Sequence, residues 1–227
     1  MNGKLYIVST PIGNYEDITL RALNILKLVD LIICEEYREG RRLLANYKID
    51  KDLTELNEHN EKEAVNDILM HLIDGKNIAL ISDCGTPLFS DPGHLLVDVL
   101  ISQKIQIIPV PGASSLMSAL VGSGFDIEKF YYYGWLSPKK DERRSQLIRL
   151  KGIHELIILM DTPYRLKSLL IDIVKILGAN IPLVLAYQLT LANERFHRGS
   201  SSAVLNIVEK NNLKGEFVLL VNNRGKL

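Results

Sequence analysis

The sequence lacks the marks of a membrane protein, a disulfide framework or a strongly charged partner. Its 27 basic and 27 acidic residues balance, so no overall field draws it toward nucleic acid. No apolar stretch approaches the roughly 20 residues of a membrane span, and the first residues lack a signal-peptide pattern. Cys34 and Cys84 stand alone without a CxxC pair or neighbouring histidine, which favours free thiols over a disulfide or zinc site. These absences predict a soluble cytoplasmic protein.

The common phosphate-binding motifs are missing too. There is no GxxxxGK[ST] segment, and Gly122-Ser123-Gly124 lacks the third glycine of a dinucleotide fingerprint. The histidines outside residue 59 have no ligand spacing, so we expect no metal site. ATPase and NAD-dependent functions lose their main support, and a neutral or zwitterionic ligand is favoured.

What the sequence does contain is an alternation of short apolar runs with helical periodicity. We expect strands at residues 5–8, 31–34, 78–81 and 105–110 in the first half. Helices are expected at 19–27, 41–47, 61–73 and 95–102, the third capped by Asn60. Such alternation predicts right-handed crossovers and a mainly parallel α/β sheet.

The second half predicts a mixed sheet. Expected strands lie at residues 130–133, 156–160 and 182–187, and helices lead toward Val121, follow Pro138, and span 165–177 and 201–210. Segments 194–199 and 216–221 are expected to pair with each other. We place the boundary near Gly112, giving an N-terminal lobe of residues 1–112 and a C-terminal lobe of residues 113–227, with a cofactor cleft between them.

Three expected loops follow strand ends, at residues 9–14, 82–93 and 109–115. Each combines proline and glycine with small hydroxyl side chains, which suits a stiff backbone presented to a small ligand. Ligands of open α/β sheets bind beyond the carboxyl ends of the strands, where these loops lie. Any one of these loops can be a simple turn between a strand and a helix. Three loops of the same composition favour a ligand-binding pocket instead.

These loops, together with the segments at residues 57–61, 134–139, 162–165, 189–190 and 215–218, follow one another in a familiar order. In that order they resemble the ribosomal RNA small-subunit methyltransferase I family of the tetrapyrrole methylase superfamily, over residues 4 to about 221. The resemblance implies two α/β lobes, S-adenosylmethionine as cofactor, a homodimer, and methylation of a cytidine ribose 2′-hydroxyl in small-subunit ribosomal RNA. The partner would be that RNA or the ribosomal subunit.

The resemblance also implies a set of cofactor-binding residues. The set is Pro11, Gly13, Asp83, Cys84, Gly85, Thr86, Pro87, Ser90, Ser114, Ser115, Leu189, Thr190, Gly215 and Glu216.

The chain departs from the family pattern on its presumed substrate side. The usual Glu-Asp-Thr-Arg is Glu35-Glu36-Tyr37-Arg38 here, and the usual Glu-Ser-Pro-His-Arg begins at Asp161 and ends at Arg165. The family's small helical C-terminal extension is also missing from this sequence. The cofactor is therefore better supported than the RNA acceptor.

Catalytic candidates follow from the chemistry of a ribose hydroxyl, which is a poor nucleophile and benefits from a base or a stabilising cation. Glu35 and Arg38, after the second strand, are candidates for base or orienter and for oxyanion stabilisation. His59 is another possible base. A surface ion pair and a loop histidine are the structural alternatives.

RNA binding needs local positive charge. The candidates cluster after residues 131–135, which include three tyrosines and a tryptophan, and in a second group after the second strand; they are Lys139, Lys140, Arg143, Arg144, Arg41 and Arg42. A solvated helix face is the alternative. Two further functions remain open: a methyltransferase for a tetrapyrrole, small molecule or peptide acceptor, and a non-catalytic cofactor-binding dimer.

Overall fold

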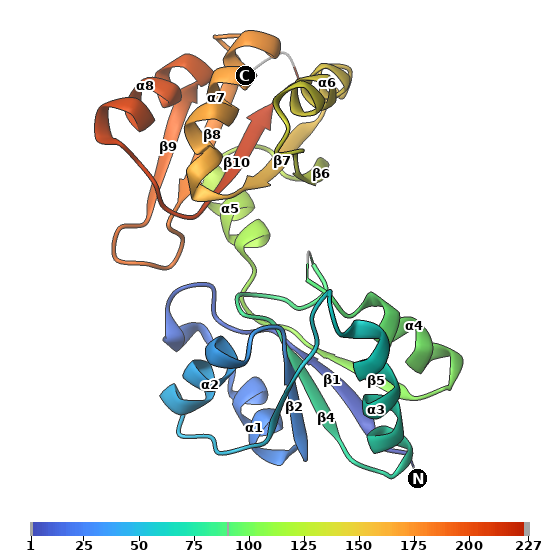
Figure 1. Cartoon of the computed structure of the whole chain (residues 1–227). Helices are drawn as coiled ribbons and strands as arrows, with labels where there is room; N and C mark the ends of the chain where they lie inside the picture. Colours follow the sequence, from blue (N-terminus) through green and yellow to red (C-terminus); the bar gives the residue numbers. More distant parts are fainter. Residues whose placement is uncertain (1, 90, 225–227) are drawn as a thin grey trace. The chain divides into compact units, whose positions relative to one another are not determined.

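The computed structural model describes residues 2–89 and 91–224. The chain divides between Ser114 and Ser115 into two units, each built on its own five-stranded sheet (Figure 1). We call the part up to Ser114 unit 1 and the part from Ser115 unit 2. The α/β fold class expected from the sequence is confirmed, with a parallel first sheet and a mixed second sheet.

Sheet A of unit 1 has the strand order β3-β2-β4-β1-β5, and its pairings are parallel. The strands are β1 (Lys4–Val8), β2 (Leu31–Cys34), β3 (Leu53–Glu55), β4 (Ile78–Ile81) and β5 (Gln106–Val110). All four residues of the central strand β4 are buried, as a strand covered on both faces requires. Pro109, which has no N–H for a ladder hydrogen bond, lies on the edge strand β5.

Two pairs of helices cover the two faces of sheet A (Figure 1). The helices are α1 (Leu20–Leu28), α2 (Tyr37–Asn46), α3 (Glu61–Ile73) and α4 (His94–Ser102). Leu26 of α1 and Leu44 of α2 belong to one buried cluster, whereas Ile68 of α3 and Leu96 of α4 belong to another. The sheet is therefore the middle of three layers, which leaves its strand ends free to carry loops.

Sheet B of unit 2 has the order β6-β7-β10-β8-β9. The strands are β6 (Phe130–Trp135), β7 (Leu156–Asp161), β8 (Pro182–Tyr187), β9 (Arg195–Ser200) and β10 (Phe217–Asn222). β6 and β7 are parallel, β10 is antiparallel to both β7 and β8, and β9 is antiparallel to β8. The expected pairing of segments 194–199 and 216–221 is wrong, because β10 lies in the centre of the sheet, where all six of its residues are buried.

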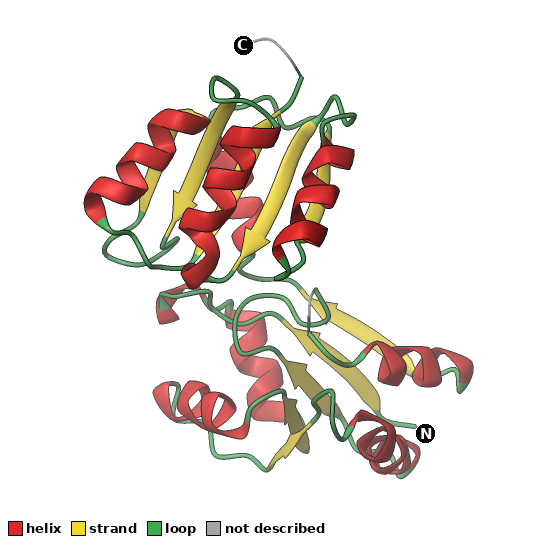
Figure 2. Cartoon of the chain, turned by 45° about the horizontal axis from the view of Figure 1, so that its top comes forward, coloured by secondary structure: helices red, strands yellow, loops and turns green. Residues whose placement is uncertain are grey.

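Three helices lie side by side across one face of sheet B (Figure 2). They are α6 (Lys140–Leu150), α7 (Leu166–Ile176) and α8 (Ser201–Asn211). Leu147, Leu169 and Val204, one from each helix, belong to one buried cluster that also contains residues of the strands. The helix α5 (Ser115–Ser123) packs on β10, β8 and β9 with Leu120 outside that cluster, so it covers the other face.

Several local expectations needed correction. The helix α2 begins at Tyr37 rather than at residue 41, and β3 was not expected. Asn60 does not cap α3 with its side chain; its Oδ1 accepts a hydrogen bond from the Asn57 N–H at 2.8 Å instead. Within the described ranges, no helix is both long and apolar enough to cross a bilayer.

Candidate functional site

The three predicted loops meet at the carboxyl edge of sheet A. They follow β1, β4 and β5, which are neighbours in the sheet. The Ser9 N–H donates to the Val110 carbonyl at 3.1 Å, and the Thr10 N–H donates to the Gly85 carbonyl at 2.8 Å. The loop after β1 is therefore bonded directly to the loops on both sides of it.

Hydroxyl groups fasten the same loops a second time. Thr10 Oγ1 donates to the Ser82 carbonyl at 3.0 Å, and the Ser9 and Thr86 hydroxyls lie 3.0 Å apart. Thr86 Oγ1 also lies 3.3 Å from the Ala113 carbonyl, to which it can donate. Ser9 and Thr10 are buried, so these side chains hold the loops to one another rather than facing a ligand.

Glycine permits the loops to approach this closely. Gly85 has φ +85°, and a Cβ placed there would lie 3.2 Å from Ile12 Cγ2. A Cβ at Gly112 would lie 3.0 Å from Ser9 Cβ. Pro11 and Pro87 are buried beside these contacts, whereas Gly13 is exposed. These close contacts join the loops after β1, β4 and β5 into one surface.

The two cysteines of the chain have different surroundings. Cys84 is exposed, and its Sγ lies 3.7 Å from the Ile12 carbonyl as a weak donor. Cys34 is buried, and that burial raises the pKa of its thiol to about 12. Ser90, also expected to bind cofactor, lies outside the described residues.

Carboxylates gather beyond β2 and β4. Burial raises the pKa of Glu35, and the charges of Asp91, Asp83 and Glu58 raise it further. The Glu36 N–H donates to Asp83 Oδ1 at 3.4 Å, which ties the end of β2 to the loop after β4. Asp91 Oδ2 is buried and accepts no hydrogen bond from any described residue. This acidic edge favours a ligand that carries positive charge or donates hydrogen bonds.

The other two catalytic candidates, Arg38 and His59, are exposed side chains. Within the described chain, no ion pair joins Glu35 to Arg38, so the structural alternative for this pair does not hold.

Four of the predicted cofactor residues of unit 2 lie in two neighbouring segments, one following β8 and one preceding β10; they are Leu189, Thr190, Gly215 and Glu216. The Gln188 N–H donates to the Glu216 carbonyl at 2.8 Å, and a Cβ on Gly215 would lie 2.5 Å from Gln188 Nε2. Thr190 has φ +66°, and its N–H donates to Glu194 Oε2 at 2.6 Å. Leu189 is buried, and Ser114 and Ser115 are half-buried at the division between the units.

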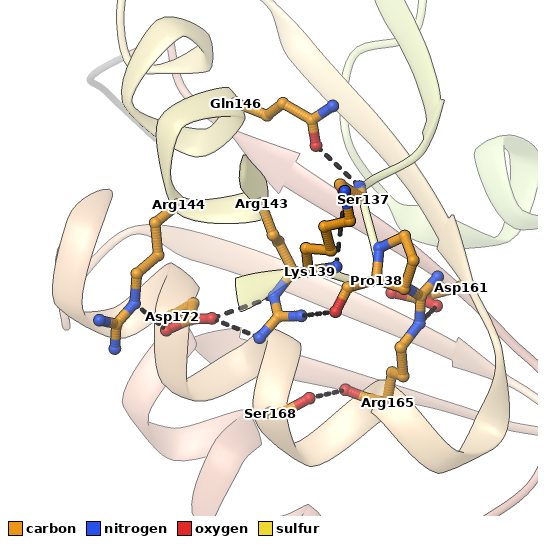
Figure 3. Close-up of polar contacts among 10 residues, drawn as sticks. All are labelled: Ser137, Pro138, Lys139, Arg143, Arg144, Gln146, Asp161, Arg165, Ser168 and Asp172. Carbon is orange, nitrogen blue, oxygen red and sulfur yellow. Dashed lines mark hydrogen bonds and ion pairs between the residues drawn. The ribbon is translucent and has the colours of Figure 1, made fainter. Parts of the chain in front are cut away.

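The basic helix α6 does not present all its charges to solvent (Figure 3). Arg143 is only 5% exposed, and its Nε and Nη2 donate to Asp172 Oδ2 at 3.0 and 2.8 Å. Arg144 Nε donates to Asp172 Oδ1 at 2.9 Å, so one buried carboxylate of α7 binds both guanidinium groups. The expectation that Arg143 belongs to an RNA-binding surface is wrong, because its side chain is in the core.

The remaining predicted RNA-binding residues differ in their surroundings. Lys139 is exposed and lies 3.0 Å from Glu142, and Arg42 lies 2.9 Å from Glu39. Arg41 donates to Tyr37 Oη and to the Lys51 carbonyl, each at 3.1 Å. Lys140 is exposed at the start of α6. Exposed pairs of this kind contribute little to stability and leave their cations accessible.

Sequence reasoning placed Asp161 and Arg165 on the presumed substrate side but gave neither residue a catalytic or binding role. Asp161 is the last residue of β7 and is 2% exposed, and its Oδ1 accepts from Arg165 Nε at 2.5 Å. The sequence signal that could have revealed this pair is the position of Asp161 directly after the apolar run 156–160, because a charge at the end of a buried strand needs a partner. Elsewhere in the described residues, no three His, Cys, Asp or Glu side chains are grouped so as to hold a metal ion.

With this geometry in view, comparison with known proteins identifies the family. The tetrapyrrole (corrin/porphyrin) methylase family matches residues 4–204. The ribosomal RNA small subunit methyltransferase I of Thermotoga maritima is 41% identical over 98% of this chain and 99% of its own length. The protein of the same name from Halalkalibacterium halodurans is 39% identical over 99% of this chain and 77% of its own length. The chain belongs to the ribosomal RNA small subunit methyltransferase I family.

Solved structures with lower identity share the fold of this family member. A cobalt precorrin-4 methyltransferase of cobalamin biosynthesis aligns with a TM-score of 0.72 at 18% identity, covering 96% of this chain and 94% of its own. The uroporphyrin-III-C-methyltransferase of Thermus thermophilus aligns with a TM-score of 0.66 at 21% identity, covering 98% and 96%. These likenesses confirm the tetrapyrrole methylase-like fold expected from the sequence.

Proposed function

We propose that this protein is an S-adenosylmethionine-dependent methyltransferase that methylates small-subunit ribosomal RNA, at a cytidine ribose 2′-hydroxyl. The observation that carries the proposal is family membership over nearly the whole chain, at about 40% identity to relatives named for that RNA. The joined loops of unit 1 support it, because they give the family's cofactor segments one rigid surface.

The chemistry of the loop edge fits the cofactor. S-adenosylmethionine carries a positive sulfonium and ribose hydroxyls that donate hydrogen bonds. Asp83 and Asp91 offer carboxylate acceptors there, and the unpartnered Asp91 Oδ2 leaves one acceptor to be satisfied. Pro11, Gly85 and Thr86 would hold the ligand by backbone contact. The assignments in unit 2 remain a prediction from the family resemblance.

The chain's own chemical task is to place a hydroxyl and remove its proton. When bound, S-adenosylmethionine supplies a methyl group already activated for transfer. Glu35 is the base best supported by its surroundings, because its raised pKa makes its carboxylate a stronger proton acceptor than an ordinary surface glutamate. Arg38 and His59 are exposed and free to meet an incoming RNA.

The decisive test is transfer of labelled methyl from S-adenosylmethionine to small-subunit particles from cells that lack the enzyme. We expect label in the RNA at a single ribose, located by nuclease digestion and mass spectrometry. Label that appears only in a small-molecule or peptide fraction would contradict the RNA assignment. Calorimetric binding of S-adenosylhomocysteine without any transfer would favour a non-catalytic module.

A matched pair of variants tests the role of Glu35. Glu35→Gln should lower the rate of transfer at least about tenfold, within the usual range for a general base, with unchanged affinity for S-adenosylhomocysteine. Asp98→Asn, which removes an exposed carboxylate of α4, should leave both unchanged. The wild-type rate should also fall as pH drops through the raised pKa of Glu35, and Glu35→Gln should lose that dependence.

The family resemblance further supports a homodimer that works in the cytoplasm. Light scattering of the purified protein should give twice the mass of one chain. A monomeric mass across the concentration range of the activity assay would contradict this part of the proposal.

A further inference from the structure

Two exposed aromatic side chains leave the same edge of sheet B. Trp135 ends β6 beside Met160 of β7 and is 44% exposed. Tyr164 lies in the 3-10 turn η2 (Pro163–Arg165), which begins two residues after β7 ends, and is 90% exposed. A β-bulge between Tyr132 and Gly134 shifts the register just before Trp135. The parallel strands β6 and β7 therefore deliver both rings to one end of the sheet.

Asp161, the last residue of β7, and Arg165, the last residue of turn η2, form an ion pair next to Tyr164 in the sequence (Figure 3). The Asp161 carboxylate is buried, and Oδ1 accepts from the Thr162 N–H at 2.6 Å and from Arg165 Nε at 2.5 Å. Its second oxygen, Oδ2, and Arg165 Nη1 are both buried, and neither has a hydrogen-bond partner among the described residues. Buried polar atoms are almost always partnered, so one missing donor and one missing acceptor call for an explanation.

Positive charge follows immediately along the chain. Lys139 and Lys140 lie at the start of α6, four and five residues after Trp135, and both are exposed. Aromatic rings, an arginine and flanking lysines are the elements with which proteins bind single-stranded nucleic acid. Arg165 is also held at Nε by Asp161, which fixes the plane of its guanidinium.

We propose that Trp135, Tyr164 and Arg165 form a docking site for one unpaired nucleotide of the RNA substrate. The base stacks on the exposed aromatic rings, and its edge supplies the acceptor that Arg165 Nη1 lacks and the donor that Asp161 Oδ2 lacks. Cytosine presents such a pair, with its N4 amino group beside N3. Both protein atoms are shielded from solvent, so turn η2 has to shift as the base enters. This inference rests on the proposed function for the identity of the RNA.

The chain is well suited to a direct binding test, because Trp135 is its only tryptophan. Titration of the full chain with short single-stranded oligocytidylate should quench tryptophan fluorescence, whereas a fully paired RNA duplex should not. Tyr164→Ala should weaken binding about tenfold, as expected for loss of one stacking contact. Tyr164→Phe, which keeps the ring, should bind like the wild type.

A matched control lies on the same strand. Tyr131 is 41% exposed at the other end of β6, and Tyr131→Ala should change oligocytidylate affinity less than twofold. Arg165→Lys should weaken binding as Tyr164→Ala does, because an ammonium cannot reproduce the planar donor set. If Arg165→Lys fails to fold, Tyr164→Ala still decides, since its exposed ring contributes little to stability.

The outcomes separate this inference from the proposed function. Quenching that is equal for the wild type and Tyr164→Ala, or no quenching at saturating oligocytidylate, would overturn the docking site even if the wild type methylates ribosomal RNA. Failure of the wild type to methylate ribosomal RNA, alongside normal quenching that depends on Tyr164, would overturn the proposed substrate and leave the nucleotide site standing.

Discussion

Units 1 and 2 each carry a five-stranded sheet, but they place very different side chains at the strand ends. The parallel sheet A ends in loops of glycine, proline and small hydroxyls joined by hydrogen bonds, with carboxylates beside them. The mixed sheet B ends in Trp135, Tyr164 and an arginine–aspartate pair. The two sheet ends therefore differ in chemistry: unit 1 presents small hydroxyls and carboxylates, and unit 2 presents aromatic rings beside an ion pair.

The interiors of the two units differ in the same sense. The buried polar side chains of unit 1, in the part of the chain described, are the uncharged hydroxyls of Ser9, Thr10 and Ser82. Unit 2 buries charges as well, at Arg143, Asp161 and Asp172 (Figure 3). Stability should therefore depend on ionic partners in unit 2 and on packing and loop contacts in unit 1.

The largest expected effect comes from breaking the buried ion network of unit 2. Asp172→Ala removes the shared carboxylate of Arg143 and Arg144 and should cost about 3–5 kcal/mol of unfolding free energy, because it leaves buried charge uncompensated. Denaturant titration followed by Trp135 fluorescence reports unit 2 directly. Glu142→Ala breaks the exposed pair with Lys139 and an exposed hydrogen bond from Ser137 Oγ, and should cost less than about 1 kcal/mol. Equal costs for the two variants would contradict the contrast.

A smaller effect should follow from crowding the loops of unit 1. Gly85→Ala places a side chain at φ +85° against Ile12 and should cost about 1–2 kcal/mol. Gly124→Ala meets the same kind of backbone, at φ +79°, but nothing lies within 4 Å of its new Cβ. Calorimetry with S-adenosylhomocysteine should show weaker binding for Gly85→Ala alone. Unchanged affinity for S-adenosylhomocysteine in both variants would contradict a role for this loop in cofactor binding.

The smallest effect concerns the carboxylates of unit 1. Because the folded-state pKa of Glu35 is raised, the folded protein binds a proton more tightly than the unfolded chain, and stability is lost as pH rises through that pKa. Glu35→Gln should therefore raise the melting temperature at pH 7 by about 1–2 °C, the shift expected for roughly half a kcal/mol in a chain of 227 residues. The gain should vanish below the ordinary pKa range of glutamate. A gain of the same size for Asp98→Asn would mean that general charge reduction, not this cluster, is responsible.

Sequence reasoning predicted the buried framework best. β2, β4, β8 and α3 begin and end where expected, because continuous apolar runs and helical periodicity survive burial unchanged. β3 was missed because it is a three-residue edge strand with no buried residue of its own. The place of β10 between β7 and β8 was missed because pairing in a mixed sheet depends on tertiary order, which local pattern does not carry.

The position of the three loops was as predictable as the buried strands, because both follow from the alternation of strands and helices. Parallel strands bring their following loops to one edge, so the meeting of the loops after β1, β4 and β5 followed from the alternation itself. Charge pattern was a poorer guide. Nothing near Arg143 in the sequence reveals that Asp172, 29 residues away on α7, draws it into the core.

The hydroxyl and backbone bonds of Ser9 and Thr10 have a consequence for affinity. Loops that are free in solution must be ordered when a ligand arrives, and each immobilised side chain subtracts from binding. Here folding has already set these loops in place. Thr10→Val would remove the hydrogen bond that holds the loop after β1 to the Ser82 carbonyl. Each molecule of ligand would then have to order a surface that folding now provides in advance.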